Sequence, residues 1–526
     1  MERVLLKNGF IWATEESNRF ITELKIEDGR IVEEFKSPKN VVSVDLKGRY
    51  VLPAFRDGHC HPLFAGREQS NFYVSGAQTL DELRDLLKKF HLENPKIGWI
   101  DASAYDPTHF KVKTAKLLDR AVQDVPVVLH SVDHHALWVN SAALAAAGIA
   151  KPVKQPSGGV IETDASGNAT GILREWPAMR LVLDLIPPRS MSQELGILES
   201  AQNQLLEYGI VAVQDAWIEP DMAEVYLRAA TKQRLRIRTD LAFKLSPEDW
   251  ESSLAAAVGY RKKIDKLDSD QLSANSVKLF IDGVISNNTA SLLPESCLRP
   301  NKHLEIWPDS TLADALHAAA SSGFQLHLHC IGDAAVRRAL DAIQALIETG
   351  VEMKLRPVIV HLEILAKAEI ARLAELNVFA NLQPLWAKYD EMAQSSLKKL
   401  THGSSARMYP IRSLLDSGAE VSFGSDWPVT SPNPLEGIRV AVTRAKGSER
   451  GLNPSEAITL AQSWRAYSKT VANQMGASDE GSLEVGQQAD FVVLNRNPFT
   501  LNRRNFDELQ VEQTWIAGTQ VSGDRD

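Results

Sequence analysis

Short apolar runs that alternate with longer amphipathic stretches restrict the fold of this chain more than any other feature. Helical stretches at 312–322, 334–348 and 366–376 fall in gaps between runs that are typical of β-strands, as in parallel βα units. The strand-like runs are 50–55, 210–215, 235–242, 276–283, 324–329, 357–361, 378–382 and 420–426. Eight such units close a barrel, so the sequence predicts an α/β fold with a TIM-like (β/α)8 barrel.

One gap in this pattern is too long for a single βα unit. Residues 62–209 separate the first strand from the second, whereas a unit takes about 30 residues in a barrel of about 250. The segment has its own helix candidate at 80–87 and strand candidates at 98–104 and 125–131. We therefore expect an inserted α/β subdomain over residues 65–205. It would leave the barrel at the end of strand one and lie over the mouth, where substrates are selected.

Both ends of the chain differ from the βα pattern, because they consist of short strand-like runs separated by turns. Asp28-Gly29 between two strand-like runs favours a tight hairpin, and similar short runs recur between 481 and 518. Each end alone would have a weak core. The sequence therefore predicts one small β-sandwich domain formed by residues 1–52 and 480–526, which leaves residues 53–64 and 206–479 for the barrel.

Charge and composition exclude several classes of partner. The chain of 526 residues has 58 basic and 67 acidic residues, so electrostatics favour neither nucleic acid nor an anionic membrane. It lacks an apolar run of about 18 residues and an N-terminal signal pattern, and its three cysteines have no regular spacing. We expect a cytoplasmic protein that acts on a small molecule. Apolar surface on the sandwich could serve a homodimer.

Polar, metal-ligating side chains gather at the carboxyl ends of the predicted strands. His59 and His61 are two residues apart in an extended segment, so both rings face the same side. The full set of candidate ligands is His59, His61, Lys278, His329, His361 and Asp426. A lone histidine at a strand end is more often structural, but buried polar groups at one end of several strands need something that satisfies them. Four imidazoles and a carboxylate are typical ligands of zinc or a similar divalent ion.

Eight segments of the chain resemble the amidohydrolase superfamily. Within it they are similar to amidohydrolase family 3, the YtcJ-like branch that includes N-substituted formamide deformylase. The segments are 52–61, 133–140, 167–175, 277–283, 329–335, 360–363, 423–428 and 486–494. The chain departs from the usual pattern at Ala54, Arg56 and Cys330, none of which replaces a ligand.

The resemblance implies how the ligands divide. His59, His61 and Asp426 would bind one ion, and His329 and His361 a second. Lys278 as a carbamate would bridge the two ions, and the alternative is a mononuclear site with an unmodified Lys278. We expect one or two divalent ions, with zinc as the first candidate.

A divalent ion at this site would lower the pKa of a bound water towards about 7 and polarise a carbonyl group. Asp426 would carry the proton from that water to the leaving nitrogen. The expected activity is hydrolysis of a non-peptide C–N bond of the amide or formamide type. The alternatives are a lactone, ester or carbamate hydrolase, a metal-assisted isomerase, and a catalytically silent regulatory relative.

Four further residues are candidates for contact with the substrate. His135, Trp138 and Glu175 belong to the predicted insertion, and His327 shares a strand face with His329. His135 could instead be hydrogen bonded inside the insertion, and Trp138 could pack in its core. Glu175 could face away from the site. His327 could support a ligand or lie deeper in the barrel.

Overall fold

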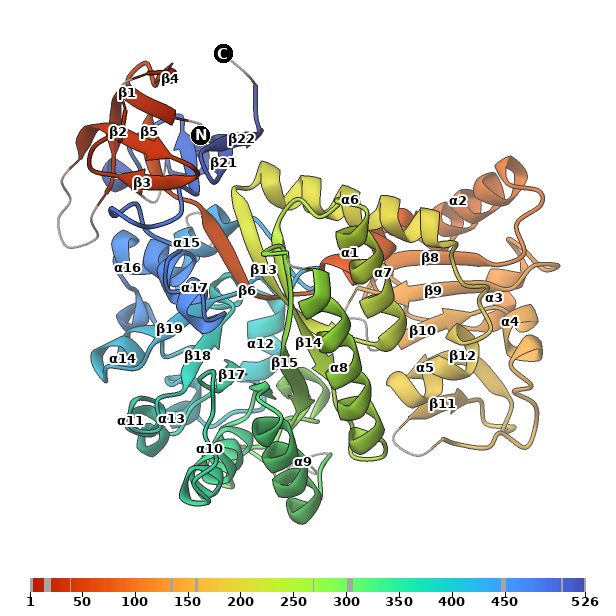
Figure 1. Ribbon diagram of the computed structural model, residues 1–526. Helices are drawn as coiled ribbons and strands as arrows, with labels where there is room; N and C mark the ends of the chain where they lie inside the picture. The colour runs from red at the N-terminus through yellow and green to blue at the C-terminus, as the bar shows by residue number, and fades with distance from the viewer. Residues whose placement is uncertain are drawn as a thin grey trace. The chain divides into compact units, whose positions relative to one another are not determined.

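The computed structural model describes most of the chain. The described residues are 3–13, 20–37, 39–132, 136–156, 159–267, 269–299, 306–445, 451–502 and 505–524. They form two compact units, one of residues Met1–Pro62 and Glu199–Asp526 and the other of Leu63–Leu198 (Figure 1). No helix among the described residues combines the length and the apolar character needed to cross a bilayer.

A barrel of eight parallel strands forms the larger part of the first unit (Figure 1). In spatial order its strands are β6 (Phe55–Cys60), β13 (Ile210–Ile218), β14 (Arg238–Lys244), β15 (Leu272–Phe280), β16 (Gln325–Cys330), β17 (Val358–His361), β18 (Phe379–Leu382) and β19 (Val421–Phe423). Consecutive strands are joined through helices, and the apolar strand residues are buried. The prediction of a (β/α)8 barrel is confirmed.

The barrel closes where its first and last strands meet. Asp426 N donates to His59 O at 2.8 Å, and His61 N donates to Trp427 O at 2.8 Å. A Cβ atom on Gly424 would lie 2.7 Å from His59 N, so only glycine permits this close approach. Backbone hydrogen bonds therefore tie the segment after β19 to the end of β6.

Helices cover the outside of the barrel and complete the βα units. The longer ones are α7 (Pro220–Thr231), α8 (Trp250–Ile264), α9 (Asp309–Ser321), α10 (Asp333–Glu348), α11 (Lys367–Glu375) and α15 (Pro434–Thr443). Shorter ones are α12 (Glu391–Leu397), α13 (His402–Ser405), α14 (Ile411–Asp416), α16 (Leu460–Ala466) and α17 (Lys469–Gln474). Their periodic apolar residues face the strands, as in α10, where Val336, Leu340 and Ile343 are buried.

Both ends of the chain contribute to one eight-stranded sheet. Its order is β22 (Thr519–Ser522), β21 (Val511–Ile516), β20 (Phe491–Leu494), β5 (Tyr50–Pro53), β1 (Arg3–Ile11), β2 (Ile21–Glu27) and β3 (Arg30–Val32), with β4 (Val41–Asp45) paired to β1. Asp28 and Gly29 have φ of 52° and 77°, as a two-residue hairpin of type I′ requires. A separate sheet domain built from both termini is thus confirmed.

The first apolar run is divided between these two sheets. The sequence favours one strand over residues 50–55, but β5 ends at Pro53 and pairs with β20, whereas Phe55 begins β6 of the barrel. Ala54 lies between them and donates its N–H to Asp490 O at 3.1 Å. Residues 51–53 of β5 and Phe55 of β6 are all buried, so hydrophobicity alone gives no sign of the change of partner.

The second unit has a six-stranded sheet of its own. Its order is β11 (Val160–Thr163), β12 (Ala169–Arg174), β10 (Ala136–Val139), β9 (Val127–Ser131), β8 (Ile100–Tyr105) and β7 (Phe72–Tyr73). Its helices are α2 (Leu80–Glu93), α3 (Ala115–Asp119), α4 (Ser141–Ala146), α5 (Trp176–Leu183) and most of α1 (Pro62–Ser70). The helix α6 (Met191–Glu207) begins in this unit and continues into the first, where it leads into β13. The boundaries 65–205 and a position over the barrel mouth stay predictions.

Candidate metal centre

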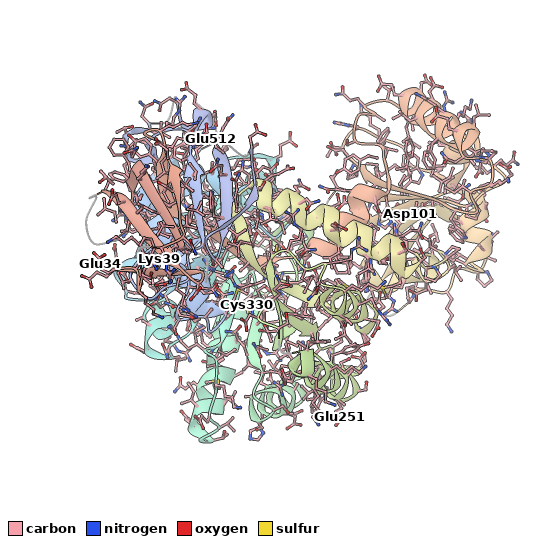
Figure 2. The ribbon with its side chains drawn as sticks, turned by 45° about the horizontal axis from the view of Figure 1, so that its top comes forward. Glu34, Lys39, Asp101, Glu251, Cys330 and Glu512 are labelled. Atoms are coloured by element: carbon pink, nitrogen blue, oxygen red, sulfur yellow. The ribbon has the colours of Figure 1, made fainter. Side chains whose placement is uncertain are left out.

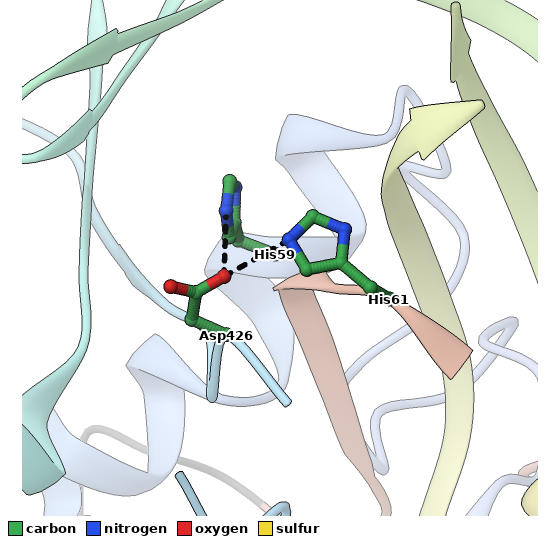
Figure 3. A group of neighbouring side chains, drawn as sticks. All are labelled: His59, His61 and Asp426. Carbon is green, nitrogen blue, oxygen red and sulfur yellow. Dashed lines mark hydrogen bonds and ion pairs between the residues drawn. The ribbon is translucent and has the colours of Figure 1, made fainter. Parts of the chain in front are cut away.

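His59, His61 and Asp426 converge at the seam where the barrel closes (Figure 3). Each offers one ligand atom, and these atoms all lie within 4.8 Å of one another. Asp426 Oδ1 lies 3.0 Å from His61 Nε2 and 3.3 Å from His59 Nε2. Two imidazole nitrogens and a carboxylate oxygen facing one point form a typical divalent metal site.

His329 and His361 extend this group along the ends of β16 and β17. The ring centroid of His361 lies 4.9 Å from that of His59 and 4.5 Å from that of His329. Trp386 stacks in parallel on His361 itself, with the two ring centroids 5.2 Å apart. The structure thus brings all four predicted imidazoles together, although the atoms of His329 and His361 are not part of the three-residue group.

The Nδ1 atom of each of the four imidazoles faces a polar side chain. The pairs are His59 with His327 Nε2 at 2.7 Å, His61 with Asp215 Oδ1 at 3.8 Å, His329 with Asp282 Oδ1 at 3.4 Å, and His361 with Gln383 Oε1 at 2.8 Å. Such outer partners fix the orientation of metal-ligating histidines and leave the other nitrogen to the ion.

Three of these partners were missed by the sequence analysis. Asp215 and Asp282 lie in the last positions of the predicted runs 210–215 and 276–283, so their place near strand ends could have revealed them. Gln383 carries no such signal because glutamine is common in loops. His327 supports His59 in the structure, which is one of the roles left open for it.

Lys278 lies on β15 and is almost fully buried. Its Nζ lies 5.0 Å from the centre of the Phe280 ring, and no hydrogen bond to it is found among the residues that the structure describes. Burial lowers the pKa of this amine to about 7, against the opposing effect of Asp426. A substantial share of the amine is therefore uncharged at neutral pH, as reaction with carbon dioxide requires.

Burial and charge act differently on the two histidines of the His-x-His pair. Burial, followed by the charge of Lys278, lowers the pKa of His59 well below its usual value. Burial also lowers the pKa of His61, but Asp215 and Asp426 outweigh it and raise that pKa to about 9. A cation and a proton therefore compete for the His61 imidazole.

Asp57 holds together the two segments that carry the first three ligands. Its Oδ1 accepts hydrogen bonds from His59 N at 3.0 Å and Ser425 N at 3.1 Å, and its Oδ2 accepts one from Ser425 Oγ at 2.5 Å. Asp426 has φ of 56° and His361 has φ of 81°, a left-handed conformation that other residues than glycine rarely adopt. Such backbone strain is typical of functional sites.

The remaining candidate residues have different surroundings. Trp138 is fully buried, its indole N–H donates to Thr114 O at 3.1 Å, and its ring packs against Tyr105 and Phe110. It therefore packs in the core of the second unit, the alternative left open for it, and contact with the substrate stays a prediction. Glu175 is half-buried at the start of α5 with φ of 62°. His135 lies outside the described residues.

Cys330, where the resemblance leads us to expect alanine, is buried at the end of β16 (Figure 2). Burial raises the pKa of its thiol well above the usual value. The side chain therefore stays protonated near neutral pH and behaves as a small apolar group rather than as a thiolate ligand.

A model of one protein family, described as the amidohydrolase family, matches residues 43–522. The chain belongs to this family. It is similar to three curated relatives over most of their length. The protein LONG AFTER FAR-RED 3 of Arabidopsis thaliana is 29% identical, covering 98% of this chain and 91% of that one. The putative amidohydrolase YtcJ of Bacillus subtilis is 26% identical and covers 99% of both chains. N-substituted formamide deformylase of Arthrobacter pascens is 27% identical, covering 90% of this chain and 89% of that one.

A solved structure supports the fold of this amidohydrolase. An uncharacterized metal-dependent hydrolase from Pyrococcus horikoshii aligns with a TM-score of 0.78 and 23% identity, over 95% of this chain and 99% of that one. The likeness to the YtcJ branch inferred from the sequence is confirmed by the family model and the two bacterial relatives. Together with the grouped ligands, the family supports a hydrolase that uses a divalent metal.

Proposed function

We propose that this amidohydrolase cleaves a non-peptide C–N bond, of the amide or formamide type, in a small molecule. The observation that carries the proposal is the convergence of His59 Nε2 and His61 Nε2 on one oxygen of Asp426. Because their Nδ1 atoms face His327 and Asp215, both rings present Nε2 to the same point. The name of the relative from Arthrobacter pascens directs the choice of substrate class to formamides.

The residues present suit a site for one or two divalent ions, zinc being the first candidate. His59, His61 and Asp426 would hold one ion, His329 and His361 a second, and Lys278 as a carbamate would bridge them. When bound, such an ion supplies a water of lowered pKa and polarises the carbonyl group under attack. Without a cation, so many buried polar groups would be costly to keep together.

Asp426 has the chemistry of the general acid and base. Its carboxylate is mostly buried, and its backbone is fixed by the hydrogen bond from its N–H to His59 O. It accepts a proton from the attacking water and returns that proton to the leaving nitrogen as the C–N bond breaks. The products are an amine and a carboxylic acid, or formate when the substrate is a formamide.

Metal analysis and a substrate screen test this proposal. The purified protein should contain between one and two equivalents of a divalent ion, and it should hydrolyse an N-substituted formamide or another amide faster than matched lactones, esters and carbamates. Asp426→Asn should lower kcat by at least about 100-fold, as expected for loss of a general acid and base.

Three results would contradict the proposal. Preferred turnover of lactones or esters would change the bond that is cleaved, and turnover without net hydrolysis would indicate an isomerase. A chain that binds no divalent ion and shows no turnover would indicate a silent relative. Two equivalents of metal in the wild type would favour the bridged site over the mononuclear one.

A further inference from the structure

A continuous row of hydrogen-bonded side chains runs from Asp240 on β14 to His361 at the end of β17. In order, its members are Asp240, Gln214, Gln474, Asn381, Gln383 and His361. All six are at most 2% exposed. Gln214 on β13 also bonds to Gln325 on β16, and strands that are not neighbours can be joined in this way only across the barrel interior.

The first member of the row can only accept hydrogen bonds. The Asp240 carboxylate receives Ser273 Oγ at 2.6 Å, Asn275 N at 2.9 Å, Ser276 Oγ at 2.7 Å and Gln214 Nε2 at 2.9 Å. Gln214 must therefore direct its NH₂ group towards Asp240, because its carbonyl oxygen has no proton to offer. This contact sets the direction of every later bond.

The direction of the hydrogen bonds set at Asp240 continues from Gln214 to Gln474, the last residue of α17. With its NH₂ group used, Gln214 presents Oε1, which accepts from Gln474 Nε2 at 2.7 Å. Gln474 also donates to Gly58 O at 2.8 Å, so its own Oε1 is left as the acceptor. That oxygen receives Asn381 Nδ2 at 3.3 Å and the hydroxyl of Ser422.

The last two amides bring this direction to the metal centre. Asn381 Oδ1 accepts from Gln383 Nε2 at 3.1 Å, and Gln383 Oε1 in turn faces His361 Nδ1 at 2.8 Å. An oxygen can only accept there, so Nδ1 of His361 must carry the proton. The neutral ring then keeps its lone pair on Nε2, the nitrogen that a metal ion needs.

We propose that this row of amides is a tautomer lock, in which Gln383, Asn381 and Gln474 are positioning residues for His361. The inference rests on the proposed function, in which His361 is a ligand of the second ion. Turning any one amide around would place donor against donor or acceptor against acceptor at both of its neighbours, in side chains that are buried from bulk solvent. The carboxylate of Asp240 thus selects the imidazole nitrogen that is available at the metal centre.

The glycine of the first histidine motif makes room for the lock. A Cβ atom on Gly58 would lie 2.6 Å from Asn381 Nδ2 and 3.1 Å from Gln474 Nε2. Gln474 meanwhile reaches five strands, because its amide or backbone bonds to Gly58, Gln214, Gln325, Asn381 and Ser422. Gly58, which precedes His59, therefore leaves room for the amides that orient His361.

Two matched variants of Gln383 separate a lock from a merely structural role. Gln383→Glu keeps an acceptor opposite His361 Nδ1 but loses the donor to Asn381 Oδ1, whereas Gln383→Met has a similar length and neither group. In chelator competition with zinc, Gln383→Met should weaken binding of the second ion by about 10 to 100-fold, the range for loss of an outer partner. Gln383→Glu should change it by less than about threefold on the same scale. Gln474→Met tests a member of the row that does not contact His361. Thermal unfolding monitors whether each variant folds.

The tautomer itself provides a readout that does not depend on metal. In metal-free protein labelled with nitrogen-15 at histidine, the His361 signal, assigned by its loss in His361→Asn, should show a protonated Nδ1. Gln383→Met and Gln474→Met should shift it towards the other tautomer, and Gln383→Glu should not. Unchanged tautomer populations in folded Gln383→Met would overturn the lock. A wild-type chain that shows the predicted tautomer but binds no divalent ion would instead overturn the proposed function.

Discussion

Removing the side chain of Asp57 should release both segments that carry the first metal ligands. In Asp57→Ala the buried N–H groups of His59 and Ser425 lose their common acceptor, which lies 3.0 and 3.1 Å away. Each buried donor left unsatisfied costs about 1 to 3 kcal/mol, so the free energy of unfolding of the barrel should fall by about 2 to 6 kcal/mol. Zinc binding should weaken by about 10 to 100-fold because Asp57 no longer ties Ser425, the neighbour of Asp426, to His59.

Asp57→Asn is the matched control for this prediction. Its carbonyl oxygen can take the place of Oδ1 and accept from both N–H groups, while its NH₂ group faces the Ser425 hydroxyl, which can turn to accept. The loss of unfolding free energy should be only about 1 kcal/mol, the value of one hydrogen bond. Urea unfolding and chelator competition measure both quantities. Equal losses in the two variants, or zinc affinity retained in Asp57→Ala, would refute the reasoning.

Four further predictions concern the pH dependence of stability and three other residues. Burial raises the pKa of Asp57 to about 7, so the folded metal-free protein binds more protons than the unfolded chain between about pH 4 and 7. Its free energy of unfolding should therefore fall as the pH rises from about 4 to 7. In urea unfolding, Asp57→Asn should lack the share of this decrease that comes from Asp57. Lys278→Ala should lose activity and regain part of it when short carboxylic acids replace the carbamate oxygens; metal retained without rescue would indicate the mononuclear site. Trp138→Ala should destabilise the second unit by about 3 to 5 kcal/mol in thermal or urea unfolding, with KM unchanged if the residue only packs. Arg56→Met should cost about 1.5 to 3 kcal/mol in urea unfolding, because buried Asp490 and Glu480 lose one ion-pair partner but keep Arg238, and metal content should not change.

The arrangement of the barrel could be read from the sequence because its strands are buried on both faces. Such strands appear as nearly continuous apolar runs, and each run at 210–215, 276–283 and 324–329 overlaps an observed strand. The ligands could be found for a related reason: a polar residue at the end of such a run is conspicuous. The division of residues 50–55 between two sheets could not, since partner choice leaves no mark on an apolar run.

The amides inside the barrel could not be recognised in the same way. Gln214 and Asn381 interrupt apolar runs, and in isolation each looks like an ordinary polar residue of a strand. Their meaning depends on Gln474, which arrives from a helix far along the chain and bonds to both. Contacts between residues so far apart in the sequence are set by tertiary packing, and no local sequence pattern encodes them.

The seam between β6 and the segment after β19 has a consequence for biosynthesis. His59 and Asp426 are held together by a backbone hydrogen bond, yet a ribosome makes them 367 positions apart, since 426 minus 59 is 367. A nascent chain therefore cannot assemble the three-ligand group until its last barrel strand has emerged. Chains that stop short of residue 426 would lack the carboxylate on which His59 and His61 converge, so loading of the first ion would report that synthesis of the whole barrel is complete.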